Sequence, residues 1–178
     1  MKDNRMKLNI QMFAIDGSGK SKRSSALLFM NTGTHDSPVW EIIGKDNDDL
    51  SRTLNNEVDS KTNVLGETDV EITKGPQTTT VDPYKIRKDS EISSKLYDAY
   101  KYDRELDELE HEFMEVFLDD KISEGEYGGF VQNGAIDLKS WGGDTKGLGA
   151  PFDINWSGEK THGKFNPTTK KFTETTTV

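Results

Sequence analysis

The sequence predicts a mainly β protein of the α+β class, in which one amphipathic helix lies across a sheet of short strands. Two observations support this prediction. Most of the chain consists of short runs of alternating apolar and polar residues, separated by turns rich in Gly, Asn, Asp and Pro. One stretch, residues 89–102, has instead the apolar spacing of a helix. An amphipathic helix supplies the apolar partner that a sheet of short strands needs.

The predicted helix begins after two good N-cap residues, Asp89 and Ser90, with Glu91 in its first turn. The apolar residues that follow share one helical face: Ile92, Leu96, Ala99 and Tyr100. We expect the helix to end near Tyr102, followed by an acidic connector and a strand over Glu110–Leu118. The pattern also permits one long helix through Leu118, because the apolar residues there fit both periods.

Before the helix, residues 37–43 are rich in β-forming residues and end at a turn without apolar side chains. Residues 50–81 contain few large apolar side chains, although Asp69–Thr73 alternates. Both faces of this segment are too polar to lie wholly on a core. We therefore expect a long polar hairpin or loop there, exposed to solvent, which is either mobile or supported by a neighbouring subunit.

After the helix, residues 123–129 read as a turn, and a strand is expected over Phe130–Trp141. The clearest strand is Phe152–Ser157, where apolar and polar side chains alternate and one face is buried. Lys164–Phe172 reads as a terminal hairpin around an Asn-Pro turn. Three tryptophans are expected in the core, the alternative being an exposed row that stacks on sugars: Trp40, Trp141 and Trp156.

Composition narrows the classes of function. At 178 residues with 31% hydrophobic residues, the chain is expected to form one domain with a modest core. No run approaches 18 apolar residues, so we expect no membrane insertion. The absence of cysteine excludes disulfides, thiolate nucleophiles and cysteine zinc sites. The three histidines are too scattered to predict a cluster: His35, His111 and His162.

The net charge of −9 is unevenly distributed. Residues 1–30 carry +4 and residues 159–178 carry +2, so residues 31–158 carry −15. We interpret residues 1–30 as a basic N-terminal extension, a flexible segment or an arm between subunits, and residues 31–178 as the folded domain. An acidic domain argues against ordinary nucleic-acid binding, which needs Lys and Arg at the phosphates. The acidic charge is consistent with a soluble protein, or with a surface along which an anion moves without binding.

One segment has an enzymatic pattern. Ala14–Ser21, AIDGSGKS, matches a relaxed form of the P-loop motif. In this interpretation Gly19, Lys20 and Ser21 would hold phosphates and magnesium. Asp119 would be a metal ligand at the end of a strand. Ala14 replaces the first glycine, and the chain lacks the continuous apolar strands of a parallel sheet. We therefore expect no catalytic residue, no cofactor and no metal site. A nucleotide-binding protein and a carbohydrate- or receptor-binding β-sandwich remain the alternative functions.

The order of the segments resembles the major tail protein, or tail tube protein, of long-tailed bacteriophages that infect Gram-positive bacteria. The resemblance covers about residues 31–175, and the chain departs from the usual form in the residues that precede Met30. The segments that carry it are Asn31–Thr34, Trp40–Gly44, Asp82–Asp89, Trp141–Gly147, Pro151–Gly158 and Gly163–Phe172.

The resemblance implies an antiparallel β-sandwich or half-barrel flanked by one α-helix. It also implies a structural virion protein without enzymatic activity, in which six copies form a ring and stacked rings form the tube through which DNA is ejected. Implied partners are further copies of the chain, other tail proteins at the tube ends, the tape-measure protein inside, and phage DNA passing without sequence-specific binding. The implied location is the virion, with assembly in the host bacterial cytoplasm. From the charge distribution we expect residues 1–30 or the basic tail to dock on the acidic face of a neighbour.

Overall fold

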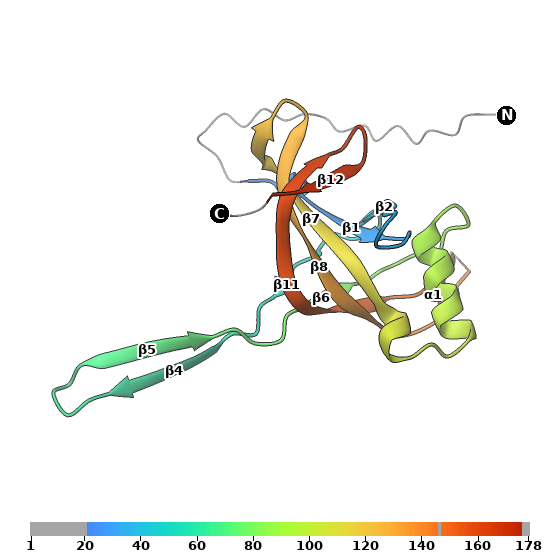
Figure 1. Ribbon diagram of the computed structural model, residues 1–178. Coiled ribbons are helices and arrows are strands. Elements are labelled where there is room, and N and C mark those ends of the chain that lie inside the picture. The colour runs from blue at the N-terminus through green and yellow to red at the C-terminus, as the bar shows by residue number, and fades with distance from the viewer. Residues whose placement is uncertain (1–20, 146, 176–178) are drawn as a thin grey trace.

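The structure, a computed structural model, describes residues 21–145 and 147–175 of the chain. In these residues an antiparallel sheet forms a half-barrel with one α-helix packed across it (Figure 1). The mainly β fold predicted from the sequence is thereby confirmed. The helices are η1 (Arg23–Ser25), α1 (Glu91–Lys101) and η2 (Leu106–Leu109). None of the helices in the described ranges has the length and apolar character needed to cross a membrane.

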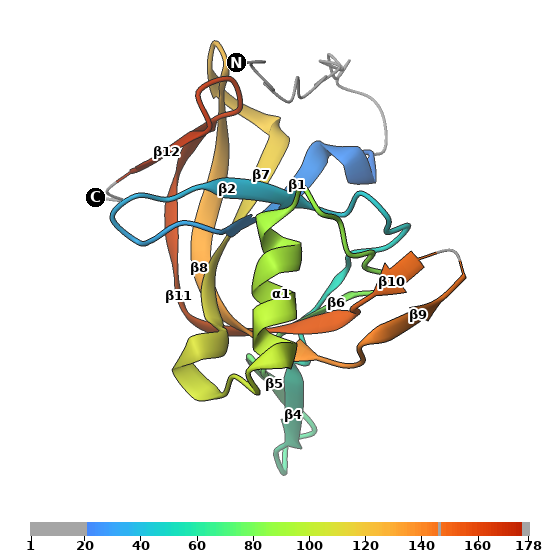
Figure 2. The same ribbon diagram turned by 90° about the vertical axis from the view of Figure 1, so that its right-hand side faces the viewer.

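The main sheet has eight strands in the order β2-β1-β7-β8-β11-β6-β3, with β12 paired to β11. Every pairing in it is antiparallel. Register shifts in β7 against β8, and in β11 between Ser157 and Thr161, accompany the bends of the long strands seen in Figure 2. The strands are β1 (Ala26–Asn31), β2 (Trp40–Ile43), β3 (Arg52–Thr53), β6 (Thr78–Val81), β7 (Glu110–Ser123), β8 (Glu126–Leu138), β11 (Phe152–Asn166) and β12 (Lys171–Glu174).

Two small hairpins lie outside this sheet. β4 (Glu57–Thr62) pairs with β5 (Thr68–Thr73), and β9 (Gly142–Asp144) pairs with β10 (Gly147–Gly149). The first hairpin lies within the predicted polar segment 50–81, and every residue in both of its strands is exposed. The end of that segment differs from the prediction, because Thr79 and Val81 of β6 are buried in the main sheet.

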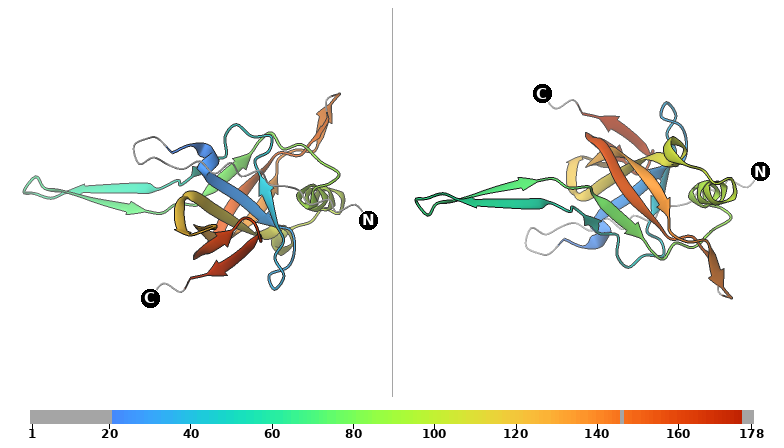
Figure 3. Two further views of the ribbon diagram at one scale, coloured as in Figure 1. Left: turned by 90° about the horizontal axis from the view of Figure 1, so that it is seen from above. Right: turned by 90° about the horizontal axis from the view of Figure 1, so that it is seen from below.

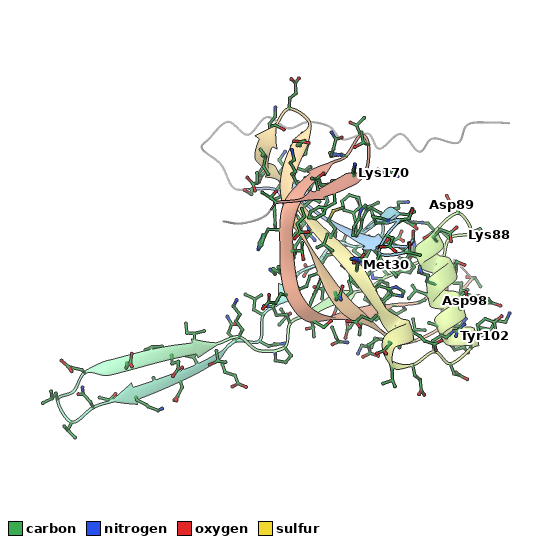
Figure 4. All side chains as sticks on the ribbon, viewed as in Figure 1. Met30, Lys88, Asp89, Asp98, Tyr102 and Lys170 are labelled. Atoms are coloured by element: carbon green, nitrogen blue, oxygen red, sulfur yellow. The ribbon has the colours of Figure 1, made fainter. Side chains whose placement is uncertain are left out.

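Helix α1 begins and ends as predicted. The side chain of Ser90 accepts a hydrogen bond from the backbone N–H of Ser93, and the Glu41 carboxylate of β2 accepts two more from Glu91 and Ile92. The helix ends at Lys101, so the single long helix is excluded. Figure 4 shows Asp98 on the helix, Tyr102 just after its end and Met30 on the strand side of the interface.

The core occupies both faces of the central strands. Ile92 and Leu96 of α1, each 1% exposed, pack on one face together with Phe113 and Ile154. A second cluster covers the opposite face of β1 and β7, beneath β12: Phe29, Trp40, Met114, Val116, Tyr127 and Phe165. A strand that is buried on both faces consists of consecutive apolar residues, and residues 26–30 are such a run.

This two-sided burial corrects the expected boundary of the N-terminal extension. Residues 26–30, assigned to the extension over 1–30, belong to β1, which pairs with β2 and β7. Met30 is fully buried and Phe29 is 3% exposed. Their short apolar run was mistaken for an unstructured segment because the polar stretch before it is rich in Gly and Ser. Residues 1–20 lie outside the described ranges.

The predicted turn over 123–129 is also too long. β7 continues to Ser123 and β8 begins at Glu126, so Gly125 lies in the turn, whereas Gly128 and Gly129 lie in β8. A Cβ atom on Gly129 would lie 2.5 Å from the carbonyl oxygen of Glu115, and one on Gly134 would lie 2.8 Å from Cγ2 of Ile154. These glycines serve the close approach of strands rather than a turn. The terminal hairpin is confirmed, because β12 pairs with β11 across residues 166–171.

The tryptophans do not form one exposed row. Trp40 is 5% exposed and confirms the core prediction. Trp156 lies under the guanidinium of Arg52, whose Cζ is 3.9 Å from the indole ring centroid. Trp141 stacks on Tyr100 of α1, with ring centroids 4.9 Å apart. The indoles of Trp156 and Trp141 therefore have ring or cation partners within the chain, and both residues are only partly buried.

We expect the substitution Gly134→Ala to lower the free energy of unfolding by about 1–3 kcal/mol, because the new methyl group overlaps Ile154 and the Phe113 ring. Urea unfolding followed by tryptophan fluorescence measures this loss. Gly149→Ala is the matched control, since the nearest atom to its Cβ would lie 3.4 Å away. Equal stability of the two variants would contradict the close packing of β8 on β7 and β11.

Burial lowers the pKa of His111, at the start of β7, from 6.5 to about 4, and nearby Lys95 adds to the shift. The folded chain therefore binds this proton less readily than the unfolded chain. Stability is fully present above pH 6.5 and is expected to fall as the pH drops from about 6.5 towards about 4. Thermal unfolding across this range tests the dependence, and His111→Gln should flatten it. An imidazole of His111 that titrates near 6.5 in NMR spectra would contradict its burial.

Candidate interaction surface

The β4–β5 hairpin, residues 57–73, projects from the body of the molecule, and we call it the arm. Figures 1 and 3 show it extending away from the half-barrel and from α1. All twelve of its strand residues are exposed. An isolated two-stranded hairpin is marginally stable in water, so the arm depends on its turn and on whatever it contacts.

The turn at the tip of the arm is held by Asn63. Its side-chain oxygen accepts hydrogen bonds from the backbone N–H groups of Leu65, at 2.9 Å, and Glu67, at 3.1 Å. Gly66 has a φ of +80°, a conformation that favours glycine. Asparagine and glycine at these positions therefore define the reversal, and they place Val64 and Leu65 outermost.

The two faces of the arm differ in chemistry. Residues directly opposite each other in an antiparallel pair lie on the same face. Val58 is opposite Ile72, and Ser60 is opposite Val70, so three aliphatic side chains share one face. Their exposed fractions are 65% for Val58, 63% for Ile72 and 55% for Val70. The other face carries four carboxylates and one lysine: Glu57, Asp59, Lys61, Asp69 and Glu71.

The tip adds two more exposed aliphatic side chains. Val64 is 102% exposed and Leu65 is 80% exposed. Five aliphatic side chains thus stand in solvent on one short segment. Such a concentration of exposed apolar surface is typical of a site that binds another surface.

The base of the arm is a tight crossing of its two chains. A Cβ atom on Gly75 would lie 1.7 Å from the carbonyl oxygen of Asn55, so only glycine fits there. Asn55 has a φ of +49°, and its side chain donates a 2.7 Å hydrogen bond to the carbonyl of Pro76. This crossing fixes the point at which the arm leaves the body.

Arg52 anchors the chain just before the base. Its side chain is 11% exposed, lies against the Trp156 ring and is 3.6 Å from the Glu115 carboxylate. It also donates a hydrogen bond to the side-chain oxygen of Gln132. Burial lowers the pKa of Arg52, and Glu115 opposes that shift. The guanidinium thereby ties β3 to β7, β8 and β11 across the interior of the half-barrel.

A groove lies at another part of the surface, between η1, the start of β1, β2 and the loop that follows β2. Its volume is about 310 Å³. Leu27, Ile42 and Leu50 contribute apolar walls, and each is partly exposed. Arg23 and Lys45, both exposed, lie at its rim. It is apolar within and cationic at two points of its edge.

The residues of the relaxed P-loop are not brought into a nucleotide site by the described part of the chain. Gly19 and Lys20 lie outside the described ranges, and Ser21 is exposed. Asp119 does not end a strand: it is an exposed residue within β7, which continues to Ser123. A P-loop follows a strand of a parallel sheet, whereas this sheet is antiparallel.

The histidines also stay apart. The ring of His35 lies 2.6 Å from the Glu112 carboxylate, which raises the pKa of this histidine. His162 packs edge-on against Phe130 with ring centroids 6.0 Å apart, and His111 is partly buried in β7. Over residues 21–145 and 147–175, no group of His, Asp and Glu is arranged to hold a metal ion.

The sequence prediction missed the apolar face of the arm. Residues 50–81 were interpreted as polar on both faces because only Asp69–Thr73 was recognised as alternating. Val58 belongs to the same stripe, yet Ser60 and Thr62, which follow it on the same face of β4, hide the period. Pairing the two strands through the Asn63 turn would have placed Val58 opposite Ile72.

We expect Arg52→Met to lower the free energy of unfolding by about 1–3 kcal/mol, because Glu115 and Gln132 lose a charged partner inside the half-barrel. Chemical denaturation measures the change. Arg104→Met is the matched control, since its ion pair with Glu108 lies on the surface and should contribute under about 0.5 kcal/mol. Similar losses for the two variants would show that Arg52 does not anchor the sheet.

Comparison with known proteins does not assign the chain to a family. No protein-family model matches the chain. No curated protein matches it either. What the protein does therefore has to follow from its residues and their geometry.

Proposed function

We propose that this chain is a structural subunit of a bacteriophage tail. Identical copies assemble into stacked rings, sixfold as in the family that the sequence resembles, and the rings form the tube through which DNA is ejected. The observation that carries the proposal is the exposed amphipathic arm. It has the character of a segment made to be covered by another chain.

The energetics of the arm favour association. Burying an aliphatic side chain fully stabilises by about 1.5–3 kcal/mol relative to leaving it in water. Val58, Val70 and Ile72 lie side by side on one face, so a single contact can cover all three. A chain with 31% hydrophobic residues that leaves these three exposed forgoes stability unless a partner covers them.

The edges of the main sheet favour the same conclusion. In the described residues β2 pairs only with β1, and β12 pairs only with β11. Each strand therefore presents a second side to which a neighbouring strand can add. Rings of identical copies satisfy such edges, since closure of a sheet around an axis removes them.

The charge of the outer sheet face suits a conduit for DNA. Where β6, β8 and β11 turn their polar side chains outward, Asp137 and Asp153 are neighbours, and Glu110 of β7 receives a hydrogen bond from Ser157. Lys139 is paired with both aspartates, at 2.5 and 2.9 Å. We place this acidic face towards the lumen, because carboxylates repel phosphates and leave a passing duplex unbound.

The remaining roles follow from the tube. The partners are further copies of this chain, other tail proteins at the tube ends and the tape-measure protein inside. DNA is cargo in transit and is not bound by sequence. The mature location is the virion, reached after assembly in the host bacterial cytoplasm. The chain contributes no catalysis in this proposal.

Electron microscopy of the purified protein at high concentration tests the proposal, with rings or tubes as the expected result. The double substitution Val58→Asn with Ile72→Asn should abolish or strongly reduce assembly because it makes the apolar face polar. The monomer should change in stability by less than about 0.5 kcal/mol, since both residues are exposed.

The matched control is Glu57→Gln with Thr73→Asn, the neighbouring pair on the opposite face of the arm. This variant should assemble as the original chain does. A compact monomer at every concentration and salt, measured by analytical ultracentrifugation, would refute the proposed function. Assembly that survives the Val58 and Ile72 substitutions would remove the arm from it.

A further inference from the structure

We propose that the tip of the arm of one copy docks in the groove beside β1 and β2 of the next copy. This inference rests on the proposed function, because it names the surface that receives the arm. Val64 and Leu65 of one copy enter between Leu27, Ile42 and Leu50 of the other. The acidic side of the arm then lies beside Arg23 and Lys45 at the rim.

Shape and polarity support this pairing. The groove has a volume of about 310 Å³ and apolar walls, and the tip offers two aliphatic side chains that are 102% and 80% exposed. Leu27, Ile42 and Leu50 are partly exposed within the groove. The contact would remove apolar surface from water on both copies at once, which is the main source of association energy.

Charge supports the same orientation. Arg23 at the groove rim directs its guanidinium to the backbone carbonyls of Ala26 and Leu50. Lys45, also exposed, belongs to the groove lining as well. Near the tip, Glu67 and Asp69 supply carboxylates. Asp48 is the acidic residue of the groove lining, so the rim is mixed, with cations flanking the entrance.

The direction of the arm makes the contact intermolecular. The arm extends away from the body and from the strands that line the groove (Figures 1 and 3). Because the arm and the groove are different surfaces, the contact is heterologous. Each copy then offers an arm to one neighbour and a groove to another. Such head-to-tail contacts generate rings or open filaments rather than closed dimers.

Cysteine cross-linking tests the pairing, since the chain has no cysteine of its own. Leu65→Cys and Lys45→Cys are made in separate full-length chains and mixed under assembly conditions with a short bismaleimide. We expect a cross-linked dimer in at least about fivefold higher yield than for Leu65→Cys mixed with Lys101→Cys. Lys101 lies at the end of α1, away from the groove.

Reversing one charge at the groove rim provides a second test of the pairing. Arg23→Glu should raise the protein concentration needed for assembly by about tenfold, because it opposes the carboxylates near the tip. Arg104→Glu, an exposed arginine after α1, should leave that concentration unchanged. Equal effects of the two reversals would overturn the proposed pairing.

The outcomes separate the two proposals. Tubes that form without a preferred cross-link between positions 65 and 45 would overturn the docking site and leave the proposed function standing. Absence of both tubes and cross-links would overturn both. A chain carrying Ile10→Cys and Lys45→Cys that cross-links within itself would assign the groove to the chain's own first residues and would also overturn the docking site.

Discussion

The structure depends on burying both faces of β1 and β7. On one face, Ile92 and Leu96 of α1 pack in the same cluster as Phe113. On the other face, Phe165 of β11 packs against Phe29, and β12 pairs with β11 beside it. A chain with 31% hydrophobic residues covers both faces of these two central strands with buried apolar side chains. The half-barrel, the position of the helix and the terminal hairpin are all arranged to cover these two strands.

The arm stands outside that arrangement. It shares no buried side chain with the core, and its strands are joined to the body through the crossing of Asn55 and Gly75. Arg52 ties the chain to the body immediately before the crossing, where its guanidinium lies against Trp156 and near the Glu115 carboxylate. The base of the arm is thus fixed to the body, whereas its exposed strands rely on their turn and on a partner for stability.

Local chemistry predicted more of the fold than long-range packing did. The helix was predictable because Ser90 and the spacing of Ile92 and Leu96 are signals within a few residues of each other. β1 was not, because its apolar run is buried on both faces only once it also pairs with β7, some ninety residues away. Gly128 and Gly129 suggested a turn but lie within β8, and Gly129 serves interstrand contact, which no local pattern distinguishes. The groove could not be predicted from local patterns either, because its walls come from β1, β2 and the loop at Leu50.

Separating the arm from the core divides the sequence into two sets of constraints. Residues that stabilise each copy are not the residues that the arm offers to its neighbour, so either set can change while the other stays fixed. A matched change at the tip and at its receiving surface would therefore yield a population that recognises only itself. Closely related chains in one cell could by this route sort into unmixed assemblies without any difference in fold.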